Sequence, residues 1–193
     1  METIFFTLKR LDEIEDSGDE LPLHILEHCM IKQDEKDFHT SVLSYCLLKK
    51  ILTEFNVDIE ELRFSKNGKP LINKGYISLS HSKDYVLVSY SLINHGVDLQ
   101  SQDKIKNNDK IIHRYFKEYL DSYLIEDEEV KNSMFYKLWT LKECVTKKND
   151  SSIFEMNNFQ NLYTFSTEML LENKMFTLSF VSDFSFQLKE LHF

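Results

Sequence analysis

The chain has 193 residues, 42% of them hydrophobic, which is enough for one sizeable core or for two small halves that share one. Its formal net charge of −9 argues against a broad surface for nucleic acid or anionic membrane, so any phosphate has to be met by a local basic pocket. Because Cys29, Cys46 and Cys144 lack the spacing of disulfide pairs or metal ligands, we expect free thiols in a reducing compartment and hence a cytoplasmic protein.

The N-terminal part is predicted to contain one strand and then two helices. Residues 3–8 are strand-like and lack the basic segment of a signal peptide, and no stretch approaches the length of a membrane span. After an acidic loop at 12–20, a helix is expected over 21–30, with Pro22 in the first turn, where a missing N–H donor costs nothing. Apolar residues then recur at helical spacing over 34–55, which predicts a longer amphipathic helix.

The middle of the chain is predicted as a loop followed by a hairpin. Residues 65–75 are polar and contain glycine, which is typical of a loop. Apolar residues alternate with serines in 77–80 and in 86–92, so we expect two strands joined by a polar turn at 80–83.

A short strand after the hairpin carries the first candidate functional residue. The turn at 94–96, in which Gly96 supplies whatever positive φ the reversal requires, leads into a strand where Val97 and Leu99 flank Asp98. Asp98 therefore points away from the face that its two neighbours bury. A carboxylate held at a fixed point is what a hard cation such as Mg²⁺ uses alongside substrate phosphates. The alternative is a solvated aspartate at the end of a strand.

Helices are predicted beyond residue 100. Residues 104–109 are polar and are expected to bridge the two halves. Aromatic and aliphatic residues recur at four-residue steps over 111–124, which predicts an amphipathic helix. Its apolar face belongs to the core or, alternatively, offers a docking patch for a partner helix. The acidic run 126–129 suits the first turn of the next helix, where the helix dipole favours negative charge.

The helix over 135–148 carries the second group of candidates. Trp139, Glu143 and Lys147 follow one another at intervals of four, so one stripe of the helix presents an indole, a carboxylate and an ammonium in a row. The alternative is an ordinary stabilising pair of Glu143 and Lys147, with Trp139 packed in the core.

The end of the chain is predicted as a turn and antiparallel strands. The turn lies at 149–152, and alternating apolar residues predict strands at 162–166, 175–181 and 184–191. The order of elements indicates an α+β fold with two comparable halves, residues 1–100 and 101–193.

Four motifs in order carry a family resemblance. They are Gly68-Lys69-Pro70, Ser80-His81-Ser82, Gly96-Val97-Asp98-Leu99-Gln100 and Trp139-Thr140-Leu141-Lys142-Glu143-Cys144-Val145-Thr146-Lys147. Over residues 31–148 the chain thereby resembles the surfactin-type 4'-phosphopantetheinyl transferases. The resemblance implies a pseudo-twofold pair of α/β halves, each an antiparallel sheet packed with helices, with coenzyme A in the cleft between them.

The resemblance also implies an activity. It is the Mg²⁺-dependent transfer of the 4'-phosphopantetheine group of coenzyme A to a serine of an acyl or peptidyl carrier protein, with release of adenosine 3',5'-bisphosphate. Such carriers serve fatty acid, polyketide or nonribosomal peptide synthesis. The expected partners are therefore coenzyme A and a carrier protein, and the expected protein is a monomer that binds neither nucleic acid nor a membrane.

Individual residues receive roles from the same resemblance. The implied metal ligands are Asp98, Glu143 and Gln100. The implied catalytic residues are Asp98, Glu143 and Lys147, with Lys147 on the phosphate oxygens and Glu143 or Glu118 as the general base. The implied cofactor-binding residues are Lys32, Ser41, Lys69, Pro70, Ser80, His81 and Lys147, with a solvated helix face as the alternative for Lys32.

Two departures from the family pattern keep other functions open. Gln100 stands where the family usually has glutamate, and an amide offers an oxygen without a charge. The turn at 149–152 contains no glycine, whereas the family more often has a glycine-containing loop. A non-catalytic module that binds coenzyme A or the carrier, and an unrelated Mg²⁺-dependent phosphoryl-transfer enzyme, are the alternatives.

Overall fold

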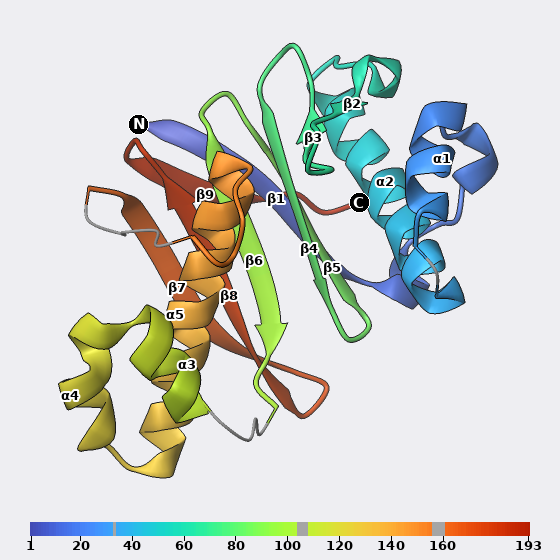
Figure 1. The fold of residues 1–193 in the computed structure, drawn as a ribbon. Coiled ribbons are helices and arrows are strands. Elements are labelled where there is room, and N and C mark those ends of the chain that lie inside the picture. The colour runs from blue at the N-terminus through green and yellow to red at the C-terminus, as the bar shows by residue number, and fades with distance from the viewer. Residues whose placement is uncertain (33, 104–107, 156–160) are drawn as a thin grey trace.

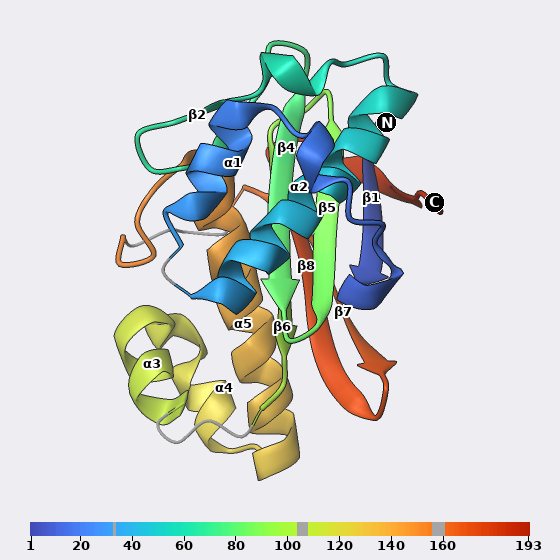
Figure 2. The same cartoon turned by 90° about the vertical axis from the view of Figure 1, so that its right-hand side faces the viewer.

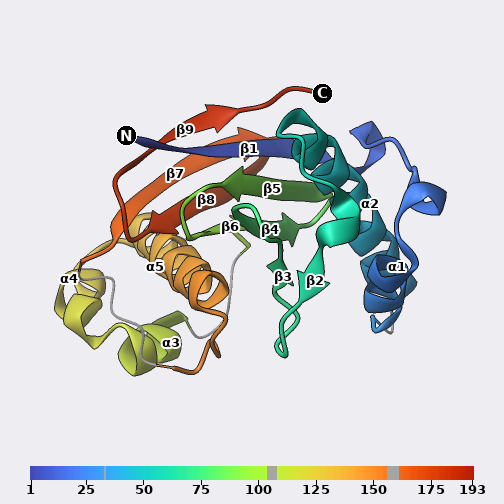
Figure 3. The ribbon, with the colours of Figure 1, turned by 90° about the horizontal axis from the view of Figure 1, so that it is seen from above.

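Two sheets lie side by side, with helices packed against them (Figure 1). The computed structural model of the chain describes residues 1–32, 34–103, 108–155 and 161–193. Figure 2 shows helices α1 (Leu23–Met30) and α2 (Glu35–Glu54) in front of one sheet, and Figure 3 shows α5 (Glu128–Asn149) against the other. The predicted α+β class is confirmed, while the pseudo-twofold relation of the halves stays a prediction.

The first sheet has the strand order β4-β5-β1-β9. Its strands are β1 (Glu2–Arg10), β4 (Tyr76–Ser82), β5 (Tyr85–Ser91) and β9 (Phe186–Glu190). β5 is antiparallel to both β4 and β1, whereas β9 joins β1 in parallel. Helix α2 packs on this sheet, and its Leu48 and Ile51 share a fully buried core with Val86 and Val88 of β5. The Asp34 carboxylate caps α2 by accepting a hydrogen bond from the backbone N–H of Lys36 at 2.9 Å.

The second sheet has the order β6-β8-β7, with both pairings antiparallel. Its strands are β6 (His95–Ser101), β7 (Tyr163–Leu171) and β8 (Lys174–Ser182). Helix α5 begins after Asp127, whose carboxylate accepts from the backbone N–H of Glu129 at 3.0 Å, and ends at Asp150 with a φ of 53°. It lies so close to β6 that a Cβ on Gly96 would be 1.9 Å from the carbonyl oxygen of Cys144. Only glycine permits this approach.

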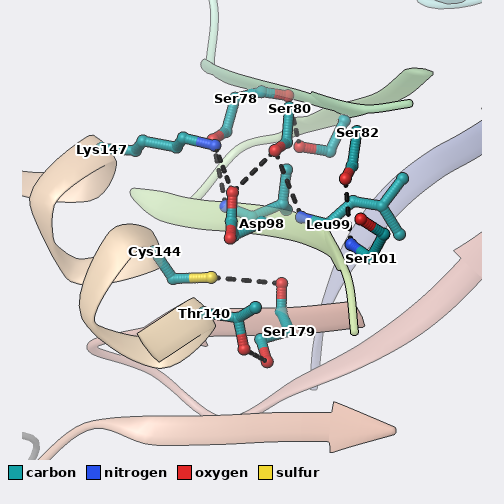
Figure 4. Close-up of polar contacts among 12 residues, drawn as sticks. Ser78, Ser80, Ser82, Asp98, Leu99, Ser101, Thr140, Cys144, Lys147 and Ser179 are labelled. Carbon is teal, nitrogen blue, oxygen red and sulfur yellow. Dashed lines mark hydrogen bonds and ion pairs between the residues drawn. The ribbon is translucent and has the colours of Figure 1, made fainter. Parts of the chain in front are cut away.

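Serine hydroxyls join the two sheets at the facing strands β4 and β6. Ser78, Ser80 and Ser82 alternate along β4, so all three face β6 (Figure 4). Their hydroxyls accept hydrogen bonds from the backbone N–H groups of Val97, Leu99 and Ser101 at 3.0, 3.2 and 2.9 Å. Side chains of one strand therefore satisfy the backbone donors of its neighbour, as a ladder partner would in a continuous sheet.

Two predicted turns are wrong. The turn expected at 80–83 lies later, because β4 continues through Ser82 and the chain reverses at Lys83, which has a φ of 56°. Ser82 stays in the strand because its hydroxyl is bonded to β6. The turn expected at 94–96 is already strand from His95 onward, and Gly96 is required there by the proximity of α5 and not by a positive φ.

Two further elements differ from their predictions. The loop expected at 65–75 contains half of a small two-stranded ladder, β2 (Arg63–Phe64) with β3 (Pro70–Leu71). The single helix expected over 111–124 is divided into α3 (Asn108–Tyr115), the 3-10 turn η4 (Lys117–Tyr119) and α4 (Leu120–Leu124). The interruption brings Phe116 and Tyr123 into one buried cluster against α5, so the core interpretation holds for these aromatic residues.

The remaining strands, helices and cysteines follow the sequence more closely. The strand at 3–8, the helices at 21–30, 34–55 and 135–148, and the three C-terminal strands are all present with small shifts of their ends.

The three cysteines are free and buried. None of the described helices is both long and apolar enough to cross a membrane. Residues 104–107 of the predicted connection lie outside the described residues.

The predicted boundary at residue 100 stays a prediction. Strand β6, which ends at Ser101, pairs with β8, and β9 from the C-terminal half pairs with β1.

Candidate functional site

The two predicted carboxylates lie on elements that pack against each other, the strand β6 and the helix α5. Asp98 is buried between Val97 and Leu99, which point into the core on the other face of the strand. Its Oδ1 accepts hydrogen bonds from the Ser80 hydroxyl and the Lys147 ammonium, each at 2.7 Å (Figure 4). The alternative of a solvated strand-end aspartate is therefore wrong, because Asp98 is only 4% exposed.

The electrostatic surroundings of Glu143 connect it to Asp98. Burial raises the pKa of the Glu143 carboxyl, and the charge of Asp98 raises this pKa further. Lys147 and Lys142 act in the opposite direction and lower it. A buried carboxyl whose ionisation is disfavoured by a neighbouring carboxylate is typical of a functional site, and a cation between the two groups would relieve the repulsion.

The residues of the predicted stripe on α5 have different surroundings, because Trp139 packs in the core whereas Lys147 reaches Asp98. Trp139 stacks on Phe135, with ring centroids 6.2 Å apart and an interplanar angle of 11°, and it packs against the cluster under α3 and α4. The core interpretation is thus correct for this residue. The ion pair that Lys147 forms among the described residues reaches across to Asp98 on β6. It is a link between two elements and not the ordinary pair within one helix.

A cavity of about 380 Å³ opens beside this group. Its walls come from α1, α2, the segment 67–70, β4 and the C-terminal end of α5. Six of the residues predicted to bind the cofactor line it: Lys32, Ser41, Lys69, Pro70, His81 and Lys147. The seventh, Ser80, faces β6 and bonds to Asp98. The structure therefore gathers most of the predicted nucleotide contacts in one place, although no helix or strand carries more than one of these six residues.

Residues 67–69 attach the end of α5 to the first half of the chain. The Lys69 ammonium donates to the carbonyl oxygen of Lys148 at 2.7 Å, and the Asn67 amide donates to the carbonyl oxygen of Asp150 at 2.8 Å. Carbonyl groups at a helix C-terminus have no partner within the helix and carry partial negative charge, so both contacts are favourable. Burial lowers the pKa of Lys69. Asn67 was not predicted, because an asparagine in a turn gives no signal beyond the turn itself.

Two histidines line the cavity. Partial desolvation lowers the pKa of His81, and the nearby Lys147 lowers it further. His28 was missed by the sequence interpretation. Its ring stacks on Phe64 at a centroid distance of 3.7 Å, and burial and Lys32 lower its pKa. The spacing of four between His28 and Lys32 gave no usable signal, because Lys32 lies beyond the end of α1 and the two residues do not share a helix face.

The donor groups near Asp98 fit a hard cation in chemical type. Its Oδ2 atom is buried and has no hydrogen-bond partner among the described residues, although a buried carboxylate oxygen normally has one. Gln100 lies two residues further along β6 and therefore on the same face of the strand. In the described ranges no three His, Cys, Asp or Glu side chains form a metal cluster, so the predicted ligand set depends on the Gln100 amide. Glu118 is exposed on η4, in the segment that packs on α5 further along.

Comparison with known proteins gives the same family as the four motifs. Residues 94–188 match the family model of the 4'-phosphopantetheinyl transferase superfamily. Two Bacillus subtilis proteins, 4'-phosphopantetheinyl transferase Sfp from strain 168 and 4'-phosphopantetheinyl transferase ffp, are each 27% identical to this chain over 135 residues. The alignment covers 66% of this chain and 59% of either relative, so it spans about three fifths of their length. The resemblance that the motifs carry is confirmed.

Proposed function

We propose that this chain, which resembles the 4'-phosphopantetheinyl transferase superfamily over residues 94–188, transfers the 4'-phosphopantetheine group of coenzyme A to a serine of an acyl or peptidyl carrier protein. The observation that carries the proposal is the position of Lys147. Its side chain lines the cavity and at the same time bonds to Asp98, which supports a single site made of the cavity, Asp98 and the neighbouring Glu143. Such a site offers positive charge and a proton acceptor beside a space for a nucleotide.

The reaction is a displacement at phosphorus. The serine oxygen of the carrier forms a bond to the phosphorus that bears pantetheine, the bond from that phosphorus to the bridging oxygen breaks, and adenosine 3',5'-bisphosphate leaves with the electron pair. The serine proton passes to a carboxylate. Phosphoryl transfer of this kind depends on position and charge stabilisation more than on covalent chemistry.

Lys147 is the cation that this chain supplies to the phosphates. Its ammonium already lies at the cavity wall, and a short side-chain movement would exchange the Asp98 oxygen for a phosphate oxygen. The exchange replaces one charge-assisted hydrogen bond by another, so it costs little. Lys32, Ser41, Lys69 and His81 line the same cavity, which supports their predicted contacts with the nucleotide.

Asp98 and Glu143, with the Gln100 amide, would hold Mg²⁺. When bound, the ion supplies positive charge that neutralises the diphosphate and the leaving group. The unpartnered Oδ2 of Asp98 and the raised pKa of Glu143 support these ligands. Because Gln100 adds no charge, we expect weaker Mg²⁺ affinity than a glutamate in its place would give.

Glu143 is also our proposed proton acceptor. A carboxylate whose pKa is raised is a stronger base than an ordinary one, which suits general-base catalysis. The alternative base, Glu118, is exposed on η4. Neither glutamate is among the residues that line the cavity, but Glu143 lies close enough to Asp98 and Lys147 for their charges to shift its pKa.

A second function, a module that binds coenzyme A without catalysis, is favoured by one observation. Gln100 replaces a charged ligand, and Lys147 neutralises the remaining charge of Asp98. Such a module would bind the nucleotide in the same cavity and form no product.

The test is intact-mass analysis of several apo-carrier proteins incubated with the chain, coenzyme A and Mg²⁺. We expect a mass gain of one phosphopantetheine group, and loss of this gain with Asp98→Asn. Asp103→Asn is the matched control, because Asp103 follows the same strand but pairs with Lys83 at 2.6 Å outside the site. Coenzyme A binding without a mass gain on any carrier would support the binding module.

Because several carrier proteins are tested, the same intact-mass analysis also identifies which of them this chain modifies. The monomeric state and the cytoplasmic location both stay predictions. The location rests on the three free cysteines.

A further inference from the structure

Among Ser78, Ser80 and Ser82 of β4, Ser80 differs in that its hydroxyl also donates a hydrogen bond to a carboxylate, that of Asp98. Ser80 accepts from the Leu99 N–H at 3.2 Å, as its neighbours do with other N–H groups, and it also donates to Asp98 Oδ1 at 2.7 Å. Ser82 accepts from the Ser101 N–H at 2.9 Å, and Ser101 lies two residues beyond Leu99 at the end of β6, away from the carboxylate. Ser80 is 7% exposed, so water does not compete freely for these bonds.

The hydroxyl of Ser80 is therefore bonded on both sides to the strand that carries Asp98. It accepts from the backbone of residue 99 and donates to the side chain of residue 98, so it fixes the carboxylate relative to its own backbone. The second donor to Oδ1, Lys147, comes from α5 and is on a flexible side chain. Both contacts are to a charged acceptor and are strong for that reason. The Ser80 contact is the more durable restraint because its hydroxyl is on a short, buried side chain that is also bonded to the Leu99 N–H, whereas Lys147 has a long side chain that loses more conformational entropy when it is held in place.

We propose that Ser80 is a positioning residue for Asp98. It holds Oδ1 in place when Lys147 turns to a substrate phosphate, and it thereby keeps Oδ2 available for the cation. The inference rests on the proposed function and gives Ser80 a role other than the predicted nucleotide contact. Residues that orient ligating carboxylates through hydrogen bonds commonly change metal affinity by an order of magnitude when they are removed.

The test compares Ser80→Ala with Ser82→Ala, because each variant removes the acceptor for one backbone N–H of β6. Urea unfolding should show a loss of stability in both, and a larger one in Ser80→Ala because this variant also removes a hydrogen-bond donor to the Asp98 carboxylate. Calorimetric titration with Mg²⁺ in the presence of coenzyme A should show affinity reduced about tenfold in Ser80→Ala and unchanged in Ser82→Ala. Ser80→Thr, which keeps the hydroxyl, should restore most of the affinity.

The outcomes separate this inference from the proposed function. Equal Mg²⁺ affinity in the two alanine variants would overturn the positioning role, and so would a weakened affinity for coenzyme A alone in Ser80→Ala, because that would be the predicted nucleotide contact. Failure of the wild-type chain to modify any carrier, with the difference in Mg²⁺ affinity intact, would overturn only the transfer activity.

Discussion

A single methyl group on Gly96 should both destabilise the protein and disturb its candidate site. In Gly96→Ala the new Cβ would lie 1.9 Å from the carbonyl oxygen and 2.7 Å from the carbonyl carbon of Cys144. An ordinary contact begins near 3.4 Å, so α5 and β6 have to separate by about 1.5 Å. The obstacle is the backbone of a helix, which cannot rotate away as a side chain can.

The size of the effect follows from the kind of contact. Overpacking a core typically costs 1–3 kcal/mol, and a clash of backbone with backbone belongs at the upper end, so we expect a loss of about 3 kcal/mol in the free energy of unfolding. For a chain of this length that corresponds to a decrease in Tm of roughly 6–12 °C. Because Glu143 adjoins Cys144, the same separation should lengthen the 2.7 Å contact of Lys147 with Asp98 and lower activity.

The assay is urea unfolding combined with carrier modification, and Gly18→Ala is the control. Gly18 also lacks a positive φ, but its nearest neighbour is the Cγ1 of Val42 at 2.9 Å, a side-chain atom that can move. We expect Gly18→Ala to lose less than about 1 kcal/mol and to keep full activity. If Gly96→Ala were as stable and as active as the control, the close approach of α5 would not be what requires glycine at this position.

Three further predictions concern pH, the end of α5 and the general base. Burial lowers the pKa of His95 to about 4 in the folded state, against 6.5 when unfolded, so the unfolded chain binds this proton first and stability should fall by about 2 kcal/mol between pH 7 and pH 5. His95→Gln should remove that part of the pH dependence in urea unfolding; an unchanged slope would contradict the assignment. Asn67→Ala should lower stability by about 1 kcal/mol and weaken coenzyme A binding in calorimetry, because the Asp150 carbonyl loses its donor, whereas Lys66→Ala in the same loop should do neither. Glu143→Gln should reduce the rate of carrier modification at least about a hundredfold and Glu118→Gln should not; the reverse order would make Glu118 the base.

The elements with regular spacing were predictable from the sequence. The four-residue intervals of α5 and α2 gave both helices nearly to their ends, since a helix face imposes its period on the residues that it buries. The same interval placed Glu143 and Lys147 on one side of α5. The carboxylate on β6 also followed from a pattern, because Val97 and Leu99 are buried and Asp98 alternates with them.

The contacts between distant segments had no such signal. A run of alternating serines in β4 looks like the solvated side of a hairpin, and the sequence does not reveal that these hydroxyls meet backbone donors of another strand. That is why the hairpin turn was expected too early. Ser80 was expected at the nucleotide because of the family resemblance, which carries no information about its contact with β6. Gly96 was interpreted as a turn residue for a related reason, since the sequence shows a missing side chain but not the helix that fills its place.

The position of Asp98 depends on both sheets at once, and this has a consequence for ligand binding. Backbone pairing holds β6 to β8 in the second sheet, whereas the Ser80 hydroxyl and its neighbours hold β6 to β4 in the first. The cavity has walls of β4 on one side and α5 on the other, and α5 packs on β6. A ligand that bridges these walls would therefore contact the same elements that position the carboxylates. We therefore expect ligand binding to be coupled to the alignment of Asp98 with Glu143, because β4 and α5 both contact β6 and a movement of either wall would change its distance from that strand.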